Sequence, residues 1–246
     1  MLKPGPPVAL PHRSFWLACA IAAGLFAALA AVTLAGEVLG HYGLARADAH
    51  VTAWLVAHRA GWLTSVLRVV TWLGSLAVII PAGVIAGLFF VMCWHRWWPV
   101  VLLAVSIAGA VGLYNLVKHL VGRPRPPPAI WIGHFSGTSF PSGHAAQSVA
   151  CYLMLAVILG AGRPPQIKIA LFGVAVLVVL VVGGSRIYLG AHWLTDVLGG
   201  YALGAAWLAA VLAVVLARWP RLLGPGSRAG TAPPGSSWRR TGDSNS

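Results

Sequence analysis

The stretch Ser185-Arg186-Ile187-Tyr188-Leu189-Gly190-Ala191-His192-Trp193-Leu194-Thr195-Asp196 places an arginine, a histidine and an aspartate between two long apolar runs. If the next helix begins near Ala191, His192 and Asp196 lie four residues apart on one helix face. The carboxylate can then accept a hydrogen bond from one ring nitrogen, which leaves the other free as a base, nucleophile or metal ligand. The glycine upstream lets the chain turn, so Arg186 can point toward the same place.

The composition indicates an integral membrane protein. Of 246 residues, 59% are hydrophobic and 9% are charged, and the mean hydropathy of +0.82 lies outside the range of soluble domains. A helix needs about 20 apolar residues to cross a hydrocarbon layer of roughly 30 Å. We therefore expect an all-α polytopic protein with six transmembrane helices, near residues 14–36, 74–94, 97–117, 144–161, 167–184 and 194–217.

The positive charge does not indicate a nucleic-acid partner. The formal charge of +13 comes from 17 Lys and Arg residues against 4 acidic residues, and much of it lies in short loops and in the tail. The sequence offers no basic, aromatic-studded soluble domain that would use this charge to bind nucleic acid. Basic residues in the loops of a membrane protein instead report its orientation, and the partner they indicate is the lipid bilayer.

With the N-terminus inside, ten of the seventeen cations lie on the cytoplasmic side. We therefore predict a cytoplasmic N-terminal segment over residues 1–13, a six-helix membrane domain over residues 14–217, and a disordered, basic cytoplasmic tail over residues 218–246. Both termini are then cytoplasmic in a bacterial-type inner membrane. The polar stretch that ends at Asp196 faces outward.

The first long loop, residues 37–73, mixes charged and aromatic side chains and predicts one or two short amphipathic helices at the membrane interface. Its histidines do not indicate a metal site, because His50 and His58 are eight residues apart with no third ligand spaced to join them. The loop also contains the charged residues Arg46, Asp48, Arg59 and Arg68, and it begins at Glu37.

Two further polar stretches fall on the same predicted membrane face. Lys118-His119-Leu120-Val121-Gly122-Arg123-Pro124-Arg125-Pro126 closes the third run, and Phe140-Pro141-Ser142-Gly143-His144 opens the fourth. Ser142 is a good N-cap residue, and Gly143 lets the backbone approach a ligand. The free amide groups of this helix start form an anion site.

Small residues four apart occur at Gly83 and Gly87 in the second run and at Gly200 and Gly204 in the sixth. Such pairs let transmembrane helices approach closely. They can serve packing within the chain or between chains, so they leave the oligomeric state open.

Together the three polar stretches supply the groups that phosphoryl transfer requires. Lys118, Arg125 and Arg186 can neutralise phosphate oxygens, and the amides near Ser142 and Gly143 add fixed donors. One histidine can attack phosphorus while the other protonates the departing oxygen. The sequence offers no cluster of carboxylates to hold magnesium, so we expect a mechanism that uses neither a metal nor another cofactor.

These stretches resemble the type 2 phosphatidic acid phosphatase (PAP2) superfamily, which also includes vanadium haloperoxidases and class A acid phosphatases. Its pattern is Lys, six residues, Arg-Pro; then Pro-Ser-Gly-His; then Ser-Arg, five residues, His, three residues, Asp. This sequence has Lys118 to Arg125-Pro126, Pro141-Ser142-Gly143-His144, and Ser185-Arg186 to His192 and Asp196. The resemblance spans roughly residues 40–217 and implies a PAP2/haloperoxidase-like helical core.

The resemblance also implies a role for each matched residue. His192 becomes the phosphohistidine, Asp196 orients it, and His144 acts as general acid and then activates water. The residues that hold the phosphate are Lys118, Arg125, Ser142, Gly143 and Arg186. Auxiliary contacts are assigned to Arg123, which also precedes a proline, and to Ser185.

We therefore expect a membrane enzyme that removes phosphate from a lipid phosphate or diphosphate. Phosphatidic acid, phosphatidylglycerol phosphate and polyprenyl diphosphate all present a suitable group, and the loops 37–73 and 127–140 would select among them. Two alternatives stay open. A vanadate-dependent haloperoxidase-like enzyme is disfavoured by the six transmembrane runs, and a transporter or silent binder of anionic lipids has no need for a His-Asp pair opposite a second histidine.

Overall fold

The computed structural model describes residues 13–222, and these contain the six expected helices long and apolar enough to cross a membrane. Within this range the chain is helical and contains no strand. The spans are Arg13–Gly40 (α1), Leu76–Trp94 (α4), Trp98–Val121 (α5), Gly143–Gly160, Pro165–Tyr188 (α8) and Leu194–Arg218 (α9). The Gly143–Gly160 span consists of α6 (Gly143–Ser148), a π-helical turn (Val149–Leu153) and α7 (Met154–Gly160).

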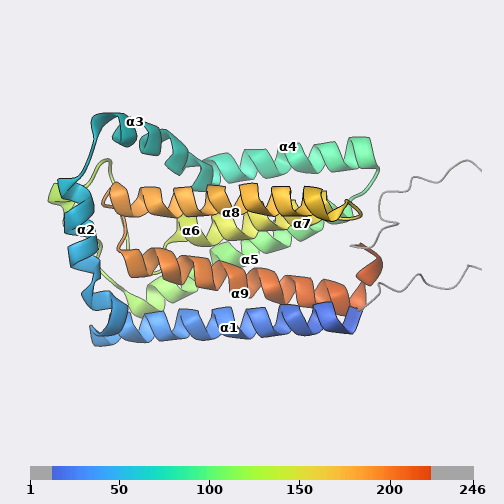
Figure 1. The fold of residues 1–246 in the computed structure, drawn as a ribbon, viewed down its shortest axis with the longest axis horizontal. Helices are drawn as coiled ribbons and strands as arrows, with labels where there is room; N and C mark the ends of the chain where they lie inside the picture. The colour runs from blue at the N-terminus through green and yellow to red at the C-terminus, as the bar shows by residue number, and fades with distance from the viewer. Residues whose placement is uncertain (1–12, 223–246) are drawn as a thin grey trace, which may run out of the picture.

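The spans form one elongated bundle (Figure 1). α1 packs along α9 at one edge, and α4 lies at the other edge. The start of α1 and the end of α9 meet at the same end of the bundle, where Arg13 Nε donates to the carbonyl of Leu216 at 2.9 Å. A short 3₁₀ turn, Pro220–Leu222, follows α9. The predicted N-terminal segment up to residue 12, and the predicted tail from residue 223, lie outside the described residues.

The opposite end of the bundle is crossed by the two short helices that the first loop predicts (Figure 1). After a 3₁₀ turn at Gly43–Arg46 come α2 (Asp48–Ala57) and α3 (Gly61–Val70). A second 3₁₀ turn, Thr71–Gly74, leads into α4. This end also receives the connections that follow α5 and α8, so all the polar stretches gather there.

A left-handed glycine brings the first cationic stretch into this end. α5 ends at Gly122, which adopts φ +62° and donates its N–H to the Lys118 carbonyl at 3.0 Å. Glycine is favoured at such a helix end because it lacks a Cβ. The prolines that follow cannot continue the helix, and the chain runs back across the bundle end.

Three spans end about four residues later than the sequence-based prediction: α1 at Gly40 rather than 36, α5 at Val121 rather than 117, and α8 at Tyr188 rather than 184. The fifth span continues past residue 184 to Tyr188, so Ser185 and Arg186 lie in the last helical turn rather than in a loop. A helix start near Ala191 would have included His192. The chain instead turns at Gly190, with φ +76°, and α9 begins at Leu194, as the predicted span 194–217 has it, so His192 precedes the helix. The start is fixed there because the Asp196 carboxylate accepts the Trp193 N–H at 2.9 Å, as expected for an acidic residue in the first turn.

The glycine pair of α9 serves packing within the chain. A Cβ on Gly200 would lie 2.5 Å from the Ser142 carbonyl oxygen, and a Cβ on Gly204 would lie 2.6 Å from the Ala146 carbonyl oxygen. α9 therefore lies directly against the backbone of α6. This close approach sets the position of the start of α6 relative to the start of α9.

We expect Gly204→Ala to destabilise the protein by about 1–3 kcal/mol, because the added methyl overpacks the contact between α9 and α6. The matched control is Gly173→Ala on α8, where an added Cβ meets nothing within 4 Å. The control should be neutral or slightly stabilising, because alanine is the better helix former. The melting temperatures of the detergent-purified variants provide the test, and equal values for the two would contradict the close contact.

Candidate active site

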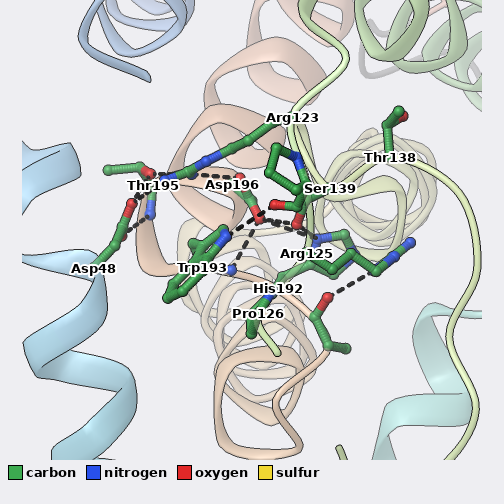
Figure 2. Close-up of polar contacts among 12 residues, drawn as sticks. Asp48, Arg123, Arg125, Pro126, Thr138, Ser139, His192, Trp193, Thr195 and Asp196 are labelled. Carbon is green, nitrogen blue, oxygen red and sulfur yellow. Dashed lines mark hydrogen bonds and ion pairs between the residues drawn. The ribbon is translucent and has the colours of Figure 1, made fainter. Parts of the chain in front are cut away.

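The three polar stretches meet toward the end of the bundle that α2 crosses (Figure 1), and Figure 2 shows the contacts between residues 123–126 and residues 192–196. Lys118 lies in the last turn of α5, and Arg186 lies in the last turn of α8. His192 lies in the α8–α9 connection, and Asp196 lies in the first turn of α9. His144 is the second residue of α6. Residues from four helices thus converge on one site.

His192 is held on both ring nitrogens. Its Nδ1 lies 3.4 Å from Asp196 Oδ2 and 3.3 Å from Ser139 Oγ, and its Nε2 lies 3.1 Å from Arg125 Nη1. The side chain is only 2% exposed. His192 precedes α9, so it shares no helix face with Asp196. The two side chains meet because the Asp196 carboxylate, in the first turn of α9, points back toward the residues before the helix. With the proton on Nδ1 facing Asp196, Nε2 carries the lone pair and accepts the hydrogen bond from Arg125 Nη1.

The Asp196 carboxylate is completely buried and has four partners. Oδ2 accepts the Trp193 N–H, the Ser139 hydroxyl and the Nδ1 side of His192. Oδ1 pairs with Arg123 Nη1 at 2.7 Å. These bonds fix the carboxylate, and the carboxylate in turn fixes the imidazole.

Arg123 connects the Asp196 carboxylate to a second buried carboxylate, that of Asp48 (Figure 2). Its Nη2 lies 2.7 Å from Asp48 Oδ2, and its Nη1 also donates to Thr195 Oγ1 at 2.8 Å. Asp48 Oδ1 accepts the Thr195 N–H at 3.0 Å, and Oδ2 accepts the Thr195 hydroxyl. Asp48 is 2% exposed. The start of α2 is thereby fastened to the start of α9.

This network corrects two expectations. Arg123, assigned as an auxiliary phosphate contact, instead uses its guanidinium on Asp48 and Asp196. Asp48, grouped with the charged residues of the interfacial loop, lies in the core of the site. One signal for Asp48 was available in the sequence: the whole chain has only four acidic residues, so each one is a candidate partner for the cations.

The other cations are held by backbone and side-chain oxygens. Lys118 Nζ donates to the carbonyls of Thr138 and Ser139, at 2.6 and 3.1 Å. Arg125 Nη1 donates to the Ala191 carbonyl at 2.6 Å, and its Nε and Nη2 donate to the carbonyls of the 136–137 turn. The loop that follows Arg125 thus folds back over the bundle end and positions two of the cations.

Two buried polar atoms at the site have no partner among the described residues. They are the Arg186 Nε and the Ser142 Oγ. Arg186 Nη1 is occupied by Thr71 Oγ1 at 2.9 Å, and its guanidinium lies 4.9 Å from the centre of the Phe135 ring. Buried polar groups are normally satisfied, so unpaired donors in a site rich in cations are suited to an anion. The hydroxyl of Ser185, expected as an auxiliary contact, donates to the Val182 carbonyl of its own helix instead.

A cavity of about 450 Å³ opens onto this site, lined in part by Arg125, Arg186 and His144. None of its described lining residues is acidic. Within residues 13–222, no three His, Cys, Asp or Glu side chains are arranged to hold a metal ion. The cavity thus brings together His144 and the cations Arg125 and Arg186, and Arg125 in turn contacts the buried ring of His192.

Comparison with known proteins agrees with this geometry. Residues 99–220 match the PAP2 superfamily. The chain is also 34% identical over 162 residues to phosphatidylglycerophosphatase B of Bacillus subtilis, an alignment that covers 64% of this chain and 78% of that protein. This chain belongs to the PAP2 superfamily. It is a multi-pass membrane phosphatase.

Two further similarities support the PAP2 assignment. The crystal structure of a transmembrane PAP2 type phosphatidylglycerolphosphate phosphatase from Bacillus subtilis matches with a TM-score of 0.70 and 30% identity, and covers 77% of this chain and 94% of that one. Lipid A 1-phosphatase of Rhizobium johnstonii is 33% identical over 115 residues, 43% of each chain.

Burial determines the protonation of the PAP2 site. Desolvation lowers the pKa of His192 to about 3; Asp196 opposes this shift, and the guanidinium groups of Arg125 and Arg186 reinforce it. Burial also lowers the pKa of Arg125, and the negative charge of Asp196 partly offsets this lowering. His192 is therefore neutral, the form that an attacking nitrogen needs, throughout the ordinary pH range.

We expect Asp48→Asn to lower kcat about 10- to 100-fold, the effect of losing one charge-assisted bond of about 1.5–3 kcal/mol that holds Arg123 and, through it, Asp196. KM should change little, because Asp48 touches none of the cations that line the cavity. His50→Gln, an exposed position on the same helix, is the control. An unchanged kcat, or a change confined to KM, would show that Asp48 does not position the nucleophile.

The lowered pKa of His192 predicts the acid side of the pH profile. Protonation of His192 removes the nucleophile, but the folded-state pKa lies well below the ordinary value of 6.5. A phosphate substrate has its own second ionisation near pH 6, and its effect on the profile is corrected for. After that correction, kcat/KM should not decline with acid until the pH is far below 6. A corrected kcat/KM that declines with a midpoint between about pH 6 and 7 would contradict a desolvated, neutral His192.

Proposed function

We propose that this PAP2 phosphatase removes phosphate from a lipid phosphate or diphosphate at the outer face of the cytoplasmic membrane, through a phosphohistidine on His192. The observation that carries the proposal is the pair of buried, unpartnered groups, Arg186 Nε and Ser142 Oγ, in the site that holds the His192 Nε2. A phosphate placed among them would satisfy both and present its phosphorus to the nitrogen.

The proposed first step transfers the phosphoryl group to the enzyme. His192 Nε2 donates its lone pair to phosphorus, the bond from phosphorus to the leaving oxygen breaks, and His144 gives that oxygen a proton. The Asp196 carboxylate faces the Nδ1 proton of the imidazole and stabilises the positive charge that develops on the ring.

The second step returns the enzyme to its starting state. His144, now neutral, takes a proton from a water molecule, the water oxygen bonds to phosphorus, and the bond from phosphorus to His192 breaks. Lys118, Arg125 and Arg186 stabilise the negative oxygens of phosphorus in both steps, and the amides near Ser142 and Gly143 add fixed donors. Because side chains supply these charges, we propose that neither step needs a metal.

The lipid nature of the substrate is inferred from the position of the cavity and from the relatives. The cavity lies at one end of a bundle whose helices expose apolar side chains along their length. A lipid can present its headgroup there while its chains stay in the bilayer. The named relatives are a phosphatidylglycerophosphatase and a lipid A 1-phosphatase, both of which act on lipids.

The proposed orientation follows from the basic residues outside the site. Arg13 and Arg218 lie at the end of the bundle opposite α2, and Arg96 follows α4 on that side. Most of the cations at the α2 end are occupied within the site, by Asp48, Asp196 and backbone carbonyls. The positive-inside rule therefore favours a cytoplasmic location for the end with Arg13 and an outward-facing active site.

The test is phosphate release by detergent-purified protein from phosphatidic acid, phosphatidylglycerol phosphate and undecaprenyl diphosphate. We expect release from at least one lipid, an activity that persists in EDTA, and a loss of about 10³-fold or more in His192→Ala, since removing a covalent nucleophile eliminates the route. Release that EDTA abolishes and magnesium restores would overturn the metal-independent mechanism. Folded protein that releases no phosphate from any of the three would overturn the proposed function.

A further inference from the structure

One cation at the active-site cavity is not used by the phosphate site. Arg68, on α3, lines the same cavity as Arg125, Arg186 and His144. It lies outside the PAP2 sequence pattern. Within residues 13–222, its guanidinium has no hydrogen-bond or ion-pair partner, whereas Arg125 and Arg186 are both fixed by neighbouring oxygens.

Helix geometry places Arg68 close to the phosphate-binding groups. Thr71, three residues further along, accepts a hydrogen bond from Arg186 Nη1 at 2.9 Å. Residues three apart lie on the same helix face, with a rise of roughly 4.5 Å between them. Thr71 begins the 3₁₀ turn that follows α3, so Arg68 lies about one turn from the threonine that holds Arg186, and all three line the cavity.

The other side of α3 is apolar and exposed. Trp62, Val66 and Val69 follow helical spacing and are 71%, 48% and 70% exposed, as expected for a face in contact with lipid. Arg68 is roughly 200° around the helix from Val66. α3 thus presents an apolar face to the bilayer and a free cation to the cavity.

A second basic group lines the cavity from another segment. His134, in the loop between α5 and α6, is an exposed lining residue, as Arg68 is. The cavity, of about 450 Å³, also extends beyond Arg125 and Arg186 to Trp72 and Ser75, in the segment between α3 and α4. With no acidic residue among the described lining, the outer part of the cavity is suited to a second anion.

We propose that Arg68, with His134, forms a subsite for a second phosphate of the substrate, so that headgroups with two phosphates are preferred over headgroups with one. The inference rests on the proposed function and narrows its substrate class. The second phosphate could be the diester of phosphatidylglycerol phosphate or the lipid-linked phosphate of a polyprenyl diphosphate. Phosphatidic acid, which has one phosphate, leaves the subsite empty.

The first experiment measures kcat/KM for two matched lipid pairs: phosphatidylglycerol phosphate against phosphatidic acid with the same acyl chains, and farnesyl diphosphate against farnesyl phosphate. The wild type should prefer the two-phosphate member, and Arg68→Gln should reduce that preference about tenfold, as for loss of one charged contact. Arg68→Lys should retain most of it. Arg46→Gln, an exposed cation at the same end of the bundle but outside the cavity, should leave the preference unchanged.

The lipid pair for which Arg68→Gln reduces the enzyme's preference identifies the source of the second phosphate. A reduction in the phosphatidylglycerol phosphate pair indicates the diester, and a reduction in the farnesyl pair indicates the diphosphate. A wild-type enzyme that turns over these lipids with no preference in either pair, or a preference that Arg68→Gln leaves intact, would overturn the subsite while the phosphatase function stands.

A second experiment is independent of turnover. Inorganic pyrophosphate should bind His192→Ala protein more tightly than inorganic phosphate, and adding Arg68→Gln should reduce this ratio about tenfold. If no lipid is hydrolysed but the Arg68-dependent ratio is found, the proposed function fails and the two-phosphate subsite stands. If the ratio is absent or does not depend on Arg68, the subsite is overturned.

Discussion

The guanidinium of Arg123, bound between the carboxylates of Asp48 and Asp196, is the interaction on which the site depends. Charges this deeply buried are costly unless paired, and removing one partner of a buried pair typically costs about 3–5 kcal/mol. The three side chains come from α2, from the segment after α5 and from α9. Their pairing therefore fixes the interfacial helices, the cationic loop and the catalytic helix start in one arrangement.

This arrangement separates the site into an acidic side and a basic side. Two carboxylates with one guanidinium leave a net negative charge behind His192, which favours the proton on Nδ1 and supports the positive charge that forms during attack. On the other side of the ring, Arg125 Nη1 lies 3.1 Å from Nε2, and the buried Arg186 Nε has no hydrogen-bond partner among the described residues. Desolvation keeps His192 neutral, and in the proposed mechanism the phosphate is bound by cations that neighbouring oxygens already hold in place.

The sequence was sufficient for the parts that depend on local composition and on the family pattern. The six spans follow from apolar length, and the convergence of His192, His144 and the cations follows from their placement at the ends of those spans. Asp48 could not be assigned in this way, because its partner is 75 positions away and an aspartate in a polar loop is usually solvated. The sixth span was predicted to begin at residue 194, where α9 begins; the alternative start near Ala191 was wrong because the first-turn carboxylate, rather than the upstream glycine, determines where the helix begins.

The central claim is that His192 carries the phosphoryl group. The most direct measurement is rapid quenching of the purified enzyme during turnover of a lipid labelled in its terminal phosphate, under alkaline conditions that preserve phosphohistidine, followed by peptide mapping. We expect transient label on the peptide that contains His192, and none on the same peptide from His192→Ala protein. Turnover at the full rate with no labelled protein, or with the label on another residue, would contradict the account.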